Sequence, residues 1–260
     1  TKGVVSTLVG VAIDEGLIDS VDQKMVDFFP ENALLESDPL MRQVSVRHLL
    51  TMADGLRAAG NTVQYTFTSP SLSLPLKRSP GEGFEDNYMS AQILSMILTR
   101  TSGKSAHELA EQYLFEPLSI GESLWADFKG QEGVSHGADG LLLTTRDMAK
   151  IGYLLLRRGA WDGKQLVPAE WIGASTTGQI QTGRASGYFG QQGFLWWVHA
   201  FAGHPGYFAV GTGGQVLCVV PDLDLVAVLT SKGENPEREE GEYLRVIERH
   251  IIGSVTERKE

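Results

Sequence analysis

Three stretches of the chain carry residue types that could do acid–base or covalent chemistry. Lys2 opens a helix-like run, Asp86, Asn87 and Tyr88 follow one another in a loop, and Gly211–Gly214 reads Gly-Thr-Gly-Gly. A lysine amine removed from water loses part of its preference for the charged form, so it can accept a proton near neutral pH. Positions i and i+3 share one face of a helix, so a lysine amine in a helix can reach a side chain one turn away.

Each stretch also has a plainer interpretation. By composition alone, Lys2 is an exposed lysine at a frayed terminus, and Tyr88 is a loop aromatic that packs on a wall. The glycines of 211–214 alone indicate only a turn or a bulge. The surrounding elements and their order along the chain must decide between these interpretations.

Helix signals dominate the first part of the chain. Residues 1–13 leave little polar face, which predicts a helix that is buried nearly all round and ends near Gly16. Ser45 is a suitable N-cap for a helix over residues 46–52. Residues 55–85 are rich in Ser, Thr, Pro and Gly without a clean period, and a loop of that length is usually functional, such as the wall of a substrate cleft.

Apolar periodicity predicts another helix over residues 91–100 that stops at Gly103. Further helix starts are predicted at the capping box of Ser105 and Glu108, at Thr144 with Asp147, and at Pro168.

The period changes after residue 190. Residues 194–198, 214–220 and 223–230 are β-rich, and Pro221-Asp222 is expected to join the last two as a hairpin. An amphipathic helix over residues 243–251 closes the chain. The pattern predicts an α+β fold, with helices followed by an antiparallel sheet that carries a helix.

The expected organisation is a single catalytic domain over residues 1–260. Its helical lobe covers about 1–190, and its sheet and closing helix cover about 191–255.

Composition excludes several classes of function. The formal charge of −10 and the lack of a Lys/Arg cluster argue against a nucleic-acid partner, because a polyanion is bound by a basic patch. No apolar run approaches the ~18 to 20 residues of a transmembrane segment. The single cysteine, Cys218, lies in an apolar run and is expected to be a buried small hydrophobe.

The histidines imply no metal. They lack a ligand spacing such as His-Glu-x-x-His, and no metal or organic cofactor is expected. His48 is expected to be a structural helix residue, and His199 and His204 are expected at the surface. The six stand at positions 48, 107, 136, 199, 204 and 250.

Several stretches, taken in order, resemble the serine β-lactamase-like family, which includes class C β-lactamases, penicillin-binding proteins, esterases and 6-aminohexanoate-dimer hydrolases. The resemblance covers roughly residues 1 to 231, and its β-lactamase/transpeptidase-like fold is the α+β architecture above. The matching stretches are residues 1–3, 10–19, 46–52, 80–84, 140–149, 161–171, 211–215 and 220–226.

The resemblance implies a Ser-x-x-Lys motif at the start of a buried helix. Thr1-Lys2 matches its last two residues, so the nucleophilic serine is expected two residues upstream of Thr1. Lys2 is then the general base or proton relay. The chain is expected to be truncated at its N-terminus, without the first strands of the sheet, which leaves a bare edge at residues 223–230 and lowers solubility.

The family's second element, Tyr-x-Asn/Ser, is displaced here. Counting from the flanking motifs places Asp86 at the tyrosine position, where a carboxylate would keep Lys2 charged. A shift of two residues instead reads Tyr88-Met89-Ser90 as Tyr-x-Ser, with Tyr88 moving the proton. We favour Tyr88, and both remain candidates, with Asn87 as a substrate-binding residue.

The third element corresponds to Gly211–Gly214, expected at the edge of the β region, where Gly211, Thr212, Gly213 and Gly214 would bind substrate. One oxyanion-hole amide is expected from Gly213 to Gln215. Thr212 stands where relatives often carry a charged or aromatic residue.

The implied function is hydrolysis of small-molecule esters, amides or peptides, with β-lactams and D-amino-acid peptides among the candidates, through an acyl-serine intermediate. Residues 1–260 alone are expected to be inactive, since Lys2 has no hydroxyl to activate. The alternative is a non-catalytic binding or regulatory member of the family, motivated by the displaced tyrosine and by Thr212.

Overall fold

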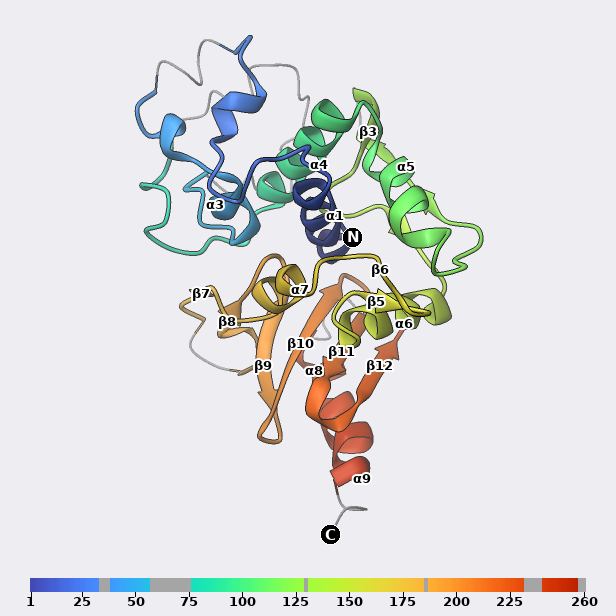
Figure 1. Cartoon of the computed structure of the whole chain (residues 1–260). Coiled ribbons are helices and arrows are strands. Elements are labelled where there is room, and N and C mark those ends of the chain that lie inside the picture. Colours follow the sequence, from blue (N-terminus) through green and yellow to red (C-terminus); the bar gives the residue numbers. More distant parts are fainter. Residues whose placement is uncertain (33–37, 57–75, 129–130, 185–186, 232–239, 257–260) are drawn as a thin grey trace. The chain divides into compact units, whose positions relative to one another are not determined.

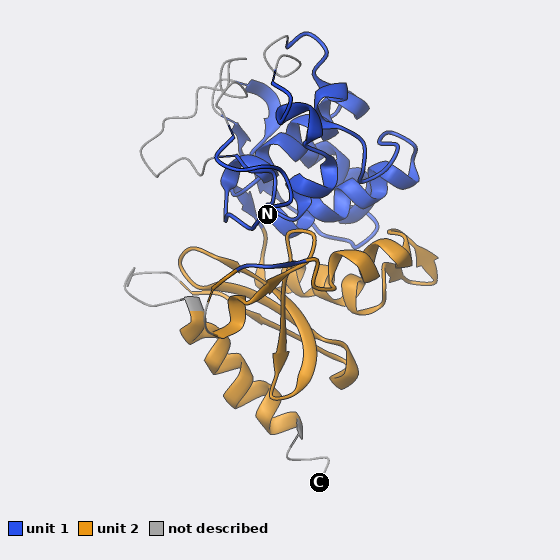
Figure 2. Ribbon diagram, turned by 90° about the vertical axis from the view of Figure 1, so that its left-hand side faces the viewer, with its two compact units in different colours: residues 1–142, 180–182 blue, residues 143–179, 183–260 orange. Residues whose placement is uncertain are grey.

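The computed structural model of the chain describes residues 1–32, 38–56, 76–128, 131–184, 187–231 and 240–256. The prediction of a functional loop over residues 55–85 falls largely outside the described residues. The backbone groups into two units (Figure 2). Unit 1 contains residues 1–142 and 180–182, and unit 2 contains residues 143–179 and 183–260. The single catalytic domain with lobes that divide near residue 190 stays a prediction.

Helix α1 (Lys2–Asp14) belongs to unit 1 and lies beside α4 in Figure 1. Every residue from Gly3 to Ala12 is buried, as expected for a helix with so little polar face, and α1 packs against α4 (Tyr88–Ser102) and α5 (Ala106–Ala110). The helix ends before Gly16, which has a φ of 69°. The predicted helix, its burial and its end are confirmed.

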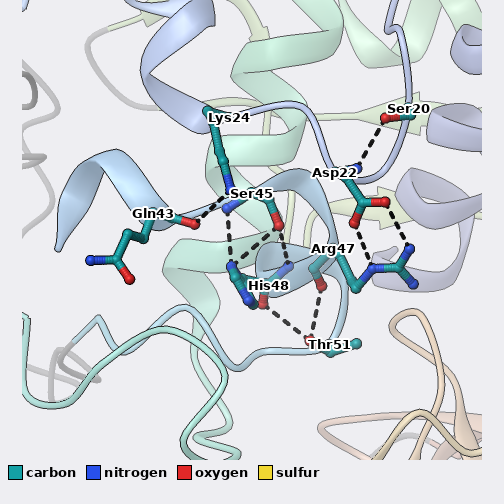
Figure 3. Close-up of polar contacts among 8 residues, drawn as sticks. All are labelled: Ser20, Asp22, Lys24, Gln43, Ser45, Arg47, His48 and Thr51. Atoms are coloured by element: carbon teal, nitrogen blue, oxygen red, sulfur yellow. Dashed lines mark hydrogen bonds and ion pairs between the residues drawn. The ribbon is translucent and has the colours of Figure 1, made fainter.

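Helix α3 (Val46–Leu50) begins with a reciprocal capping arrangement, shown in Figure 3. The Ser45 backbone N–H donates to His48 Nδ1 at 3.1 Å, and the His48 backbone N–H donates to Ser45 Oγ at 3.5 Å. Burial lowers the pKa of His48, which agrees with a ring nitrogen that accepts a hydrogen bond. The expectation that His48 is structural is confirmed.

The same close-up shows the hydrogen bonds that join α3 to the preceding segment. Arg47 donates from Nε and Nη2 to both carboxylate oxygens of Asp22 at 2.9 and 3.3 Å. Thr51 Oγ1 donates back to the Arg47 carbonyl at 2.9 Å, and the helix ends at Leu50, two residues before the expected position.

Helix α4 begins at its N-cap Asn87 and ends before Gly103, whose φ of 71° suits the glycine. The predicted stop is confirmed, and the start lies three residues before the expected Ala91. The capping box of Ser105 and Glu108 is present as predicted.

Short antiparallel strand pairs complete unit 1. The sequence did not predict them, because three of the four strands are only two residues long and carry no measurable alternation. The pairs are β1 (Leu124–Trp125) with β4 (Leu141–Leu142), and β2 (Asp127–Phe128) with β3 (Gln131–Ser135).

Unit 2 begins with α6 (Thr145–Leu156), whose N-cap is Thr144 as predicted. It packs on strands β11 (Gln215–Val220) and β12 (Leu225–Leu229) of the main sheet. Gly152 makes this approach possible, because an added Cβ would lie 2.6 Å from Val226 and 2.7 Å from Leu217. The neighbouring elements are β5 (Ala160–Trp161), β6 (Lys164–Gln165) and α7 (Ala169–Ser175).

The main sheet is antiparallel and follows the order β12-β11-β10-β9-β8-β7. Strand β11 is buried at every residue from Val216 to Val220, so both of its faces are covered. The predicted hairpin at Pro221-Asp222 joins β11 and β12. The strands are β7 (Ile180–Gln181), β8 (Gln191–Gln192), β9 (Trp197–Phe201), β10 (His204–Gly211), β11 (Gln215–Val220) and β12 (Leu225–Leu229).

The strand expected over residues 194–198 is displaced toward the C-terminus, to β9. Leu195 has a φ of 61°, a left-handed conformation that a strand cannot contain, so pairing begins only at Trp197.

The closing helix forms as expected, as α8 (Glu240–Val246), a π-helical turn (Ile247–Ile252) and α9 (Gly253–Thr256). Glu248 ties it to the sheet, accepting from Tyr188 Oη at 2.5 Å and from the Ala202 N–H at 2.7 Å. Among the helices that the structure describes, none is both long and apolar enough to cross a membrane.

Candidate active site

Lys2 lies at the first position of α1 and turns toward the segment that starts α4. Its Nζ lies 3.3 Å from Asp86 Oδ1, with a quarter of the lysine side chain exposed. An ion pair at such partial exposure contributes about 0–1 kcal/mol to stability. The ion pair therefore stabilises the fold little. Its main effect is to place an amine and a carboxylate next to each other.

Tyr88 is the second partner of Lys2. The lysine Nζ lies 5.4 Å from the centre of the Tyr88 ring, within the range of a cation–π contact, and Tyr88 is 46% exposed. The structure thus brings together Lys2, Asp86 and Tyr88, the three residues expected to be catalytic. Asp86 makes the polar contact, whereas Tyr88 presents its ring to the amine.

Asn87 lies between them but points into unit 1. It is 2% exposed, its Oδ1 accepts the Met89 N–H at 2.7 Å, and its Nδ2 donates to the Leu56 carbonyl at 3.5 Å. The side chain therefore caps α4 and joins it to a neighbouring turn. Substrate binding by Asn87 stays a prediction, and the observed contacts are structural.

Ser90, the third residue of the shifted Tyr-x-Ser reading, is also directed inward. It is fully buried, and its Oγ donates to Asp54 Oδ2 at 2.5 Å. Sequence reasoning did not single out Asp54, because an isolated aspartate after a short helix carries no motif.

Gly211–Gly214 forms the turn between β10 and β11 in unit 2. Gly211 pairs with Gln215, the Gly214 N–H donates to the Gly211 carbonyl at 3.1 Å, and Gly213 and Gly214 have φ values of 92° and 88°. Gly213 and Gly214 are thus favoured by the left-handed backbone conformation at their positions. Substrate binding by Gly211, Thr212, Gly213 and Gly214 stays a prediction.

Tyr243 of α8 packs directly on this turn. A Cβ added at Gly214 would lie 2.4 Å from Tyr243 Cζ, so a side chain at that position would have to displace the ring. The sequence analysis assigned Tyr243 only to the closing helix.

The other candidates do not assemble into a site. His199 packs against Tyr188 and Phe201, and His204 Nδ1 lies 2.7 Å from Asp222 Oδ2. Cys218 is buried as expected, and burial raises the pKa of its thiol to about 12. Within the described ranges no group of His, Cys, Asp and Glu side chains could hold a metal ion.

Comparisons with known proteins agree with this architecture. The 6-aminohexanoate-dimer hydrolase of Paenarthrobacter ureafaciens is 26% identical over 266 residues, which cover 91% of this chain and 66% of that enzyme. This chain thus spans about two thirds of the length of that relative.

Solved structures share the fold. A D-stereospecific amidohydrolase from Streptomyces sp. superposes with a TM-score of 0.71 at 15% identity and covers 97% of this chain and 84% of its own. The octameric penicillin-binding protein homologue from Pyrococcus abyssi gives a TM-score of 0.72 at 19% identity and covers 95% of this chain and 64% of its own.

The family comparison covers nearly the whole chain. The model of the Beta-lactamase family matches residues 1–250, and the fold of helices with an antiparallel sheet is the one shared with the solved structures. The chain therefore belongs to the Beta-lactamase family.

Proposed function

We propose that residues 1–260 are part of a serine hydrolase that cleaves esters or amides through an acyl-serine intermediate. The nucleophile is the serine expected three positions before Lys2. The observation that carries the proposal is the position of the Lys2 amine at the start of a buried helix, 3.3 Å from Asp86 and facing the Tyr88 ring. Membership of a family of hydrolases supports the reaction class.

In this proposal Lys2 accepts the proton of the serine hydroxyl as the serine oxygen attacks the carbonyl carbon. Lys2 becomes an ammonium group at that moment, and the Asp86 carboxylate stabilises the new charge. The carbonyl–heteroatom bond then breaks, and a proton is delivered to the leaving group. Water then hydrolyses the acyl-serine, which regenerates the serine and releases the acid product.

Tyr88 is proposed to move the proton that the leaving group takes. Its side chain is half exposed, and the centre of its ring lies 5.4 Å from Lys2 Nζ, which places the side chain beside the amine that accepts the serine proton. A poor leaving group such as an amine needs that proton, whereas p-nitrophenolate does not.

The experiment uses the full-length protein, including the residues upstream of Thr1. It is incubated with a fluorophosphonate probe, p-nitrophenyl esters, nitrocefin and D-amino-acid amides between pH 6 and pH 10. Labelling of a serine three positions before Lys2, with turnover of one of these substrates, is the expected result. If no serine is labelled and no substrate is turned over across this pH range, the hydrolase proposal is wrong.

The second candidate is a non-catalytic binding member of the family. The Lys2–Asp86 ion pair favours it, because an ammonium group that is held by a carboxylate is a poor base. In that case a residue other than serine stands three positions before Lys2, and the full-length protein binds small acids or amides without consuming them.

A further inference from the structure

Residues 52–56 form a turn that holds the segment around Asp86 from both sides. The Met52 carbonyl accepts the Glu85 N–H at 2.9 Å, and the Leu56 carbonyl accepts Asn87 Nδ2 at 3.5 Å. Glu85 and Asn87 are the two neighbours of Asp86 in the chain. Asp86 is therefore fixed on each side by the same turn.

Asp54 is the buried centre of this turn. It is 2% exposed, its Oδ1 accepts the Leu56 N–H at 2.8 Å, and its Oδ2 accepts Ser90 Oγ at 2.5 Å. Ser90 is fully buried in the first turn of α4, just after Tyr88. One carboxylate thus joins the turn to the beginning of the helix that carries the candidate site.

Among the residues that the structure describes, Asp54 has no ion-pair partner of opposite charge. Glu85 faces Asp54 as a like charge and is itself paired with Arg78 Nη2 at 2.6 Å and Lys77 Nζ at 3.0 Å. Burial raises the pKa of Asp54 to about 6, against the opposing effect of the Ser90 hydrogen bond. A buried carboxylate is a costly way to satisfy two donors that a neutral oxygen could also satisfy.

We propose that Asp54 is a positioning residue of the Lys2 site, which fixes the first turn of α4 through Ser90 and so holds Asp86 and Tyr88 beside the Lys2 amine. The kinetic part of the test rests on the hydrolase function proposed above. A second measurement, on the amine itself, does not need that function.

The kinetic test compares Asp54→Ala, Ser90→Ala and Asp54→Asn in the full-length protein. Both alanine variants are expected to lower kcat for p-nitrophenyl esters by about 10-fold to 100-fold with little change in KM, because the reacting groups lose their alignment. Asp54→Asn keeps the shape of the side chain, accepting from Leu56 and donating to Ser90 Oγ, and is expected to restore most of kcat.

Ser95→Ala is the matched control. Ser95 is also a fully buried serine of α4, and its Oγ donates to the Ser135 carbonyl at 2.7 Å, away from the Asp54 turn. It should lower the melting temperature about as much as Ser90→Ala and leave kcat unchanged. Equal losses of kcat in Ser90→Ala and Ser95→Ala would overturn the positioning role.

The second measurement is the reactivity of the Lys2 amine toward trace amounts of acetic anhydride, in the chain of residues 1–260. Asp54→Ala and Ser90→Ala are expected to change Lys2 labelling at least about threefold relative to Lys164, because Asp86 and Tyr88 leave the amine. Asp54→Asn and Ser95→Ala are expected to leave the labelling of Lys2 relative to Lys164 unchanged. Unchanged labelling in both alanine variants would overturn the inference. Changed labelling in a protein that hydrolyses nothing would support it and remove only the hydrolase function.

Discussion

Lys2 Nζ and Asp86 Oδ1 lie 3.3 Å apart although 84 positions separate the two residues in the chain. The contact forms because α1 packs against α4, with Lys2 at the first position of α1 and Asp86 just before Asn87, the N-cap of α4. It places an amine, a carboxylate and the Tyr88 ring in one part of unit 1.

Replacing Lys2 by arginine tests its role as a base. A guanidinium group can keep the ion pair with Asp86 but cannot be deprotonated in a protein. We expect Lys2→Arg in the full-length protein to lower fluorophosphonate labelling by at least about 10²-fold with an unchanged melting temperature. Lys77→Arg, which keeps its own pair with Glu85, is the control. Labelling that survives in Lys2→Arg would show that Lys2 does not accept the proton.

Replacing Tyr88 by phenylalanine separates the phenol from the ring. The ring contact with Lys2 remains, and only the hydroxyl is lost. We expect amide turnover to fall by about 10²-fold to 10⁴-fold, and acylation by p-nitrophenyl esters to change little, because p-nitrophenolate leaves without a proton. The two substrates are compared by steady-state kinetics on the same preparation. Equal losses on both would assign Tyr88 to the attack step instead.

Asp54 makes the stability of the chain depend on pH. Its pKa is raised in the folded state from 3.8 to about 6, so folding favours the protonated form. The contribution of protonated Asp54 to the free energy of unfolding is fully present below about pH 4 and is lost as the pH rises through about 6. Between these limits the loss is on the order of 3 kcal/mol. Urea unfolding from pH 4 to pH 7 should therefore show Asp54→Asn gaining stability relative to the wild type. If the free energies of unfolding of the wild type and of Asp54→Asn changed with pH in the same way, the raised pKa of Asp54 would be contradicted.

Gly214 and Gly203 form a matched pair for the turn beside Tyr243. Both have a φ of 88°, but a Cβ at Gly203 meets open space, whereas a Cβ at Gly214 meets the Tyr243 ring. We expect Gly203→Ala to cost about 1 kcal/mol through backbone strain alone. Gly214→Ala should cost a further 1–3 kcal/mol, roughly, from overpacking. Equal melting temperatures for the two variants would mean that the Tyr243 ring moves aside freely.

Much of the local structure could be predicted from the sequence, because it depends on neighbours in the chain. The capping box of Ser105 and Glu108 and the stop at Gly103 each involve residues a few positions apart, and all are observed. Strand β10 was missed because Pro205 and Gly206 are rare in central strands. The strand accommodates them because Pro205 pairs only with β9, and pairing with β11 begins at Tyr207.

The sequence by itself determined the family resemblance, the α+β architecture and the buried first helix, and it predicted Lys2 as catalytic, with Tyr88 and Asp86 as alternative candidates beside it. Only the tertiary structure decided that Asp86 makes the polar contact with Lys2, that Asn87 points inward, and that Asp54 is tied to Ser90. The physical reason is distance along the chain. Hydrophobic periodicity and capping report on residues within a few turns of one another, whereas a contact across 84 or 36 positions depends on how the helices pack.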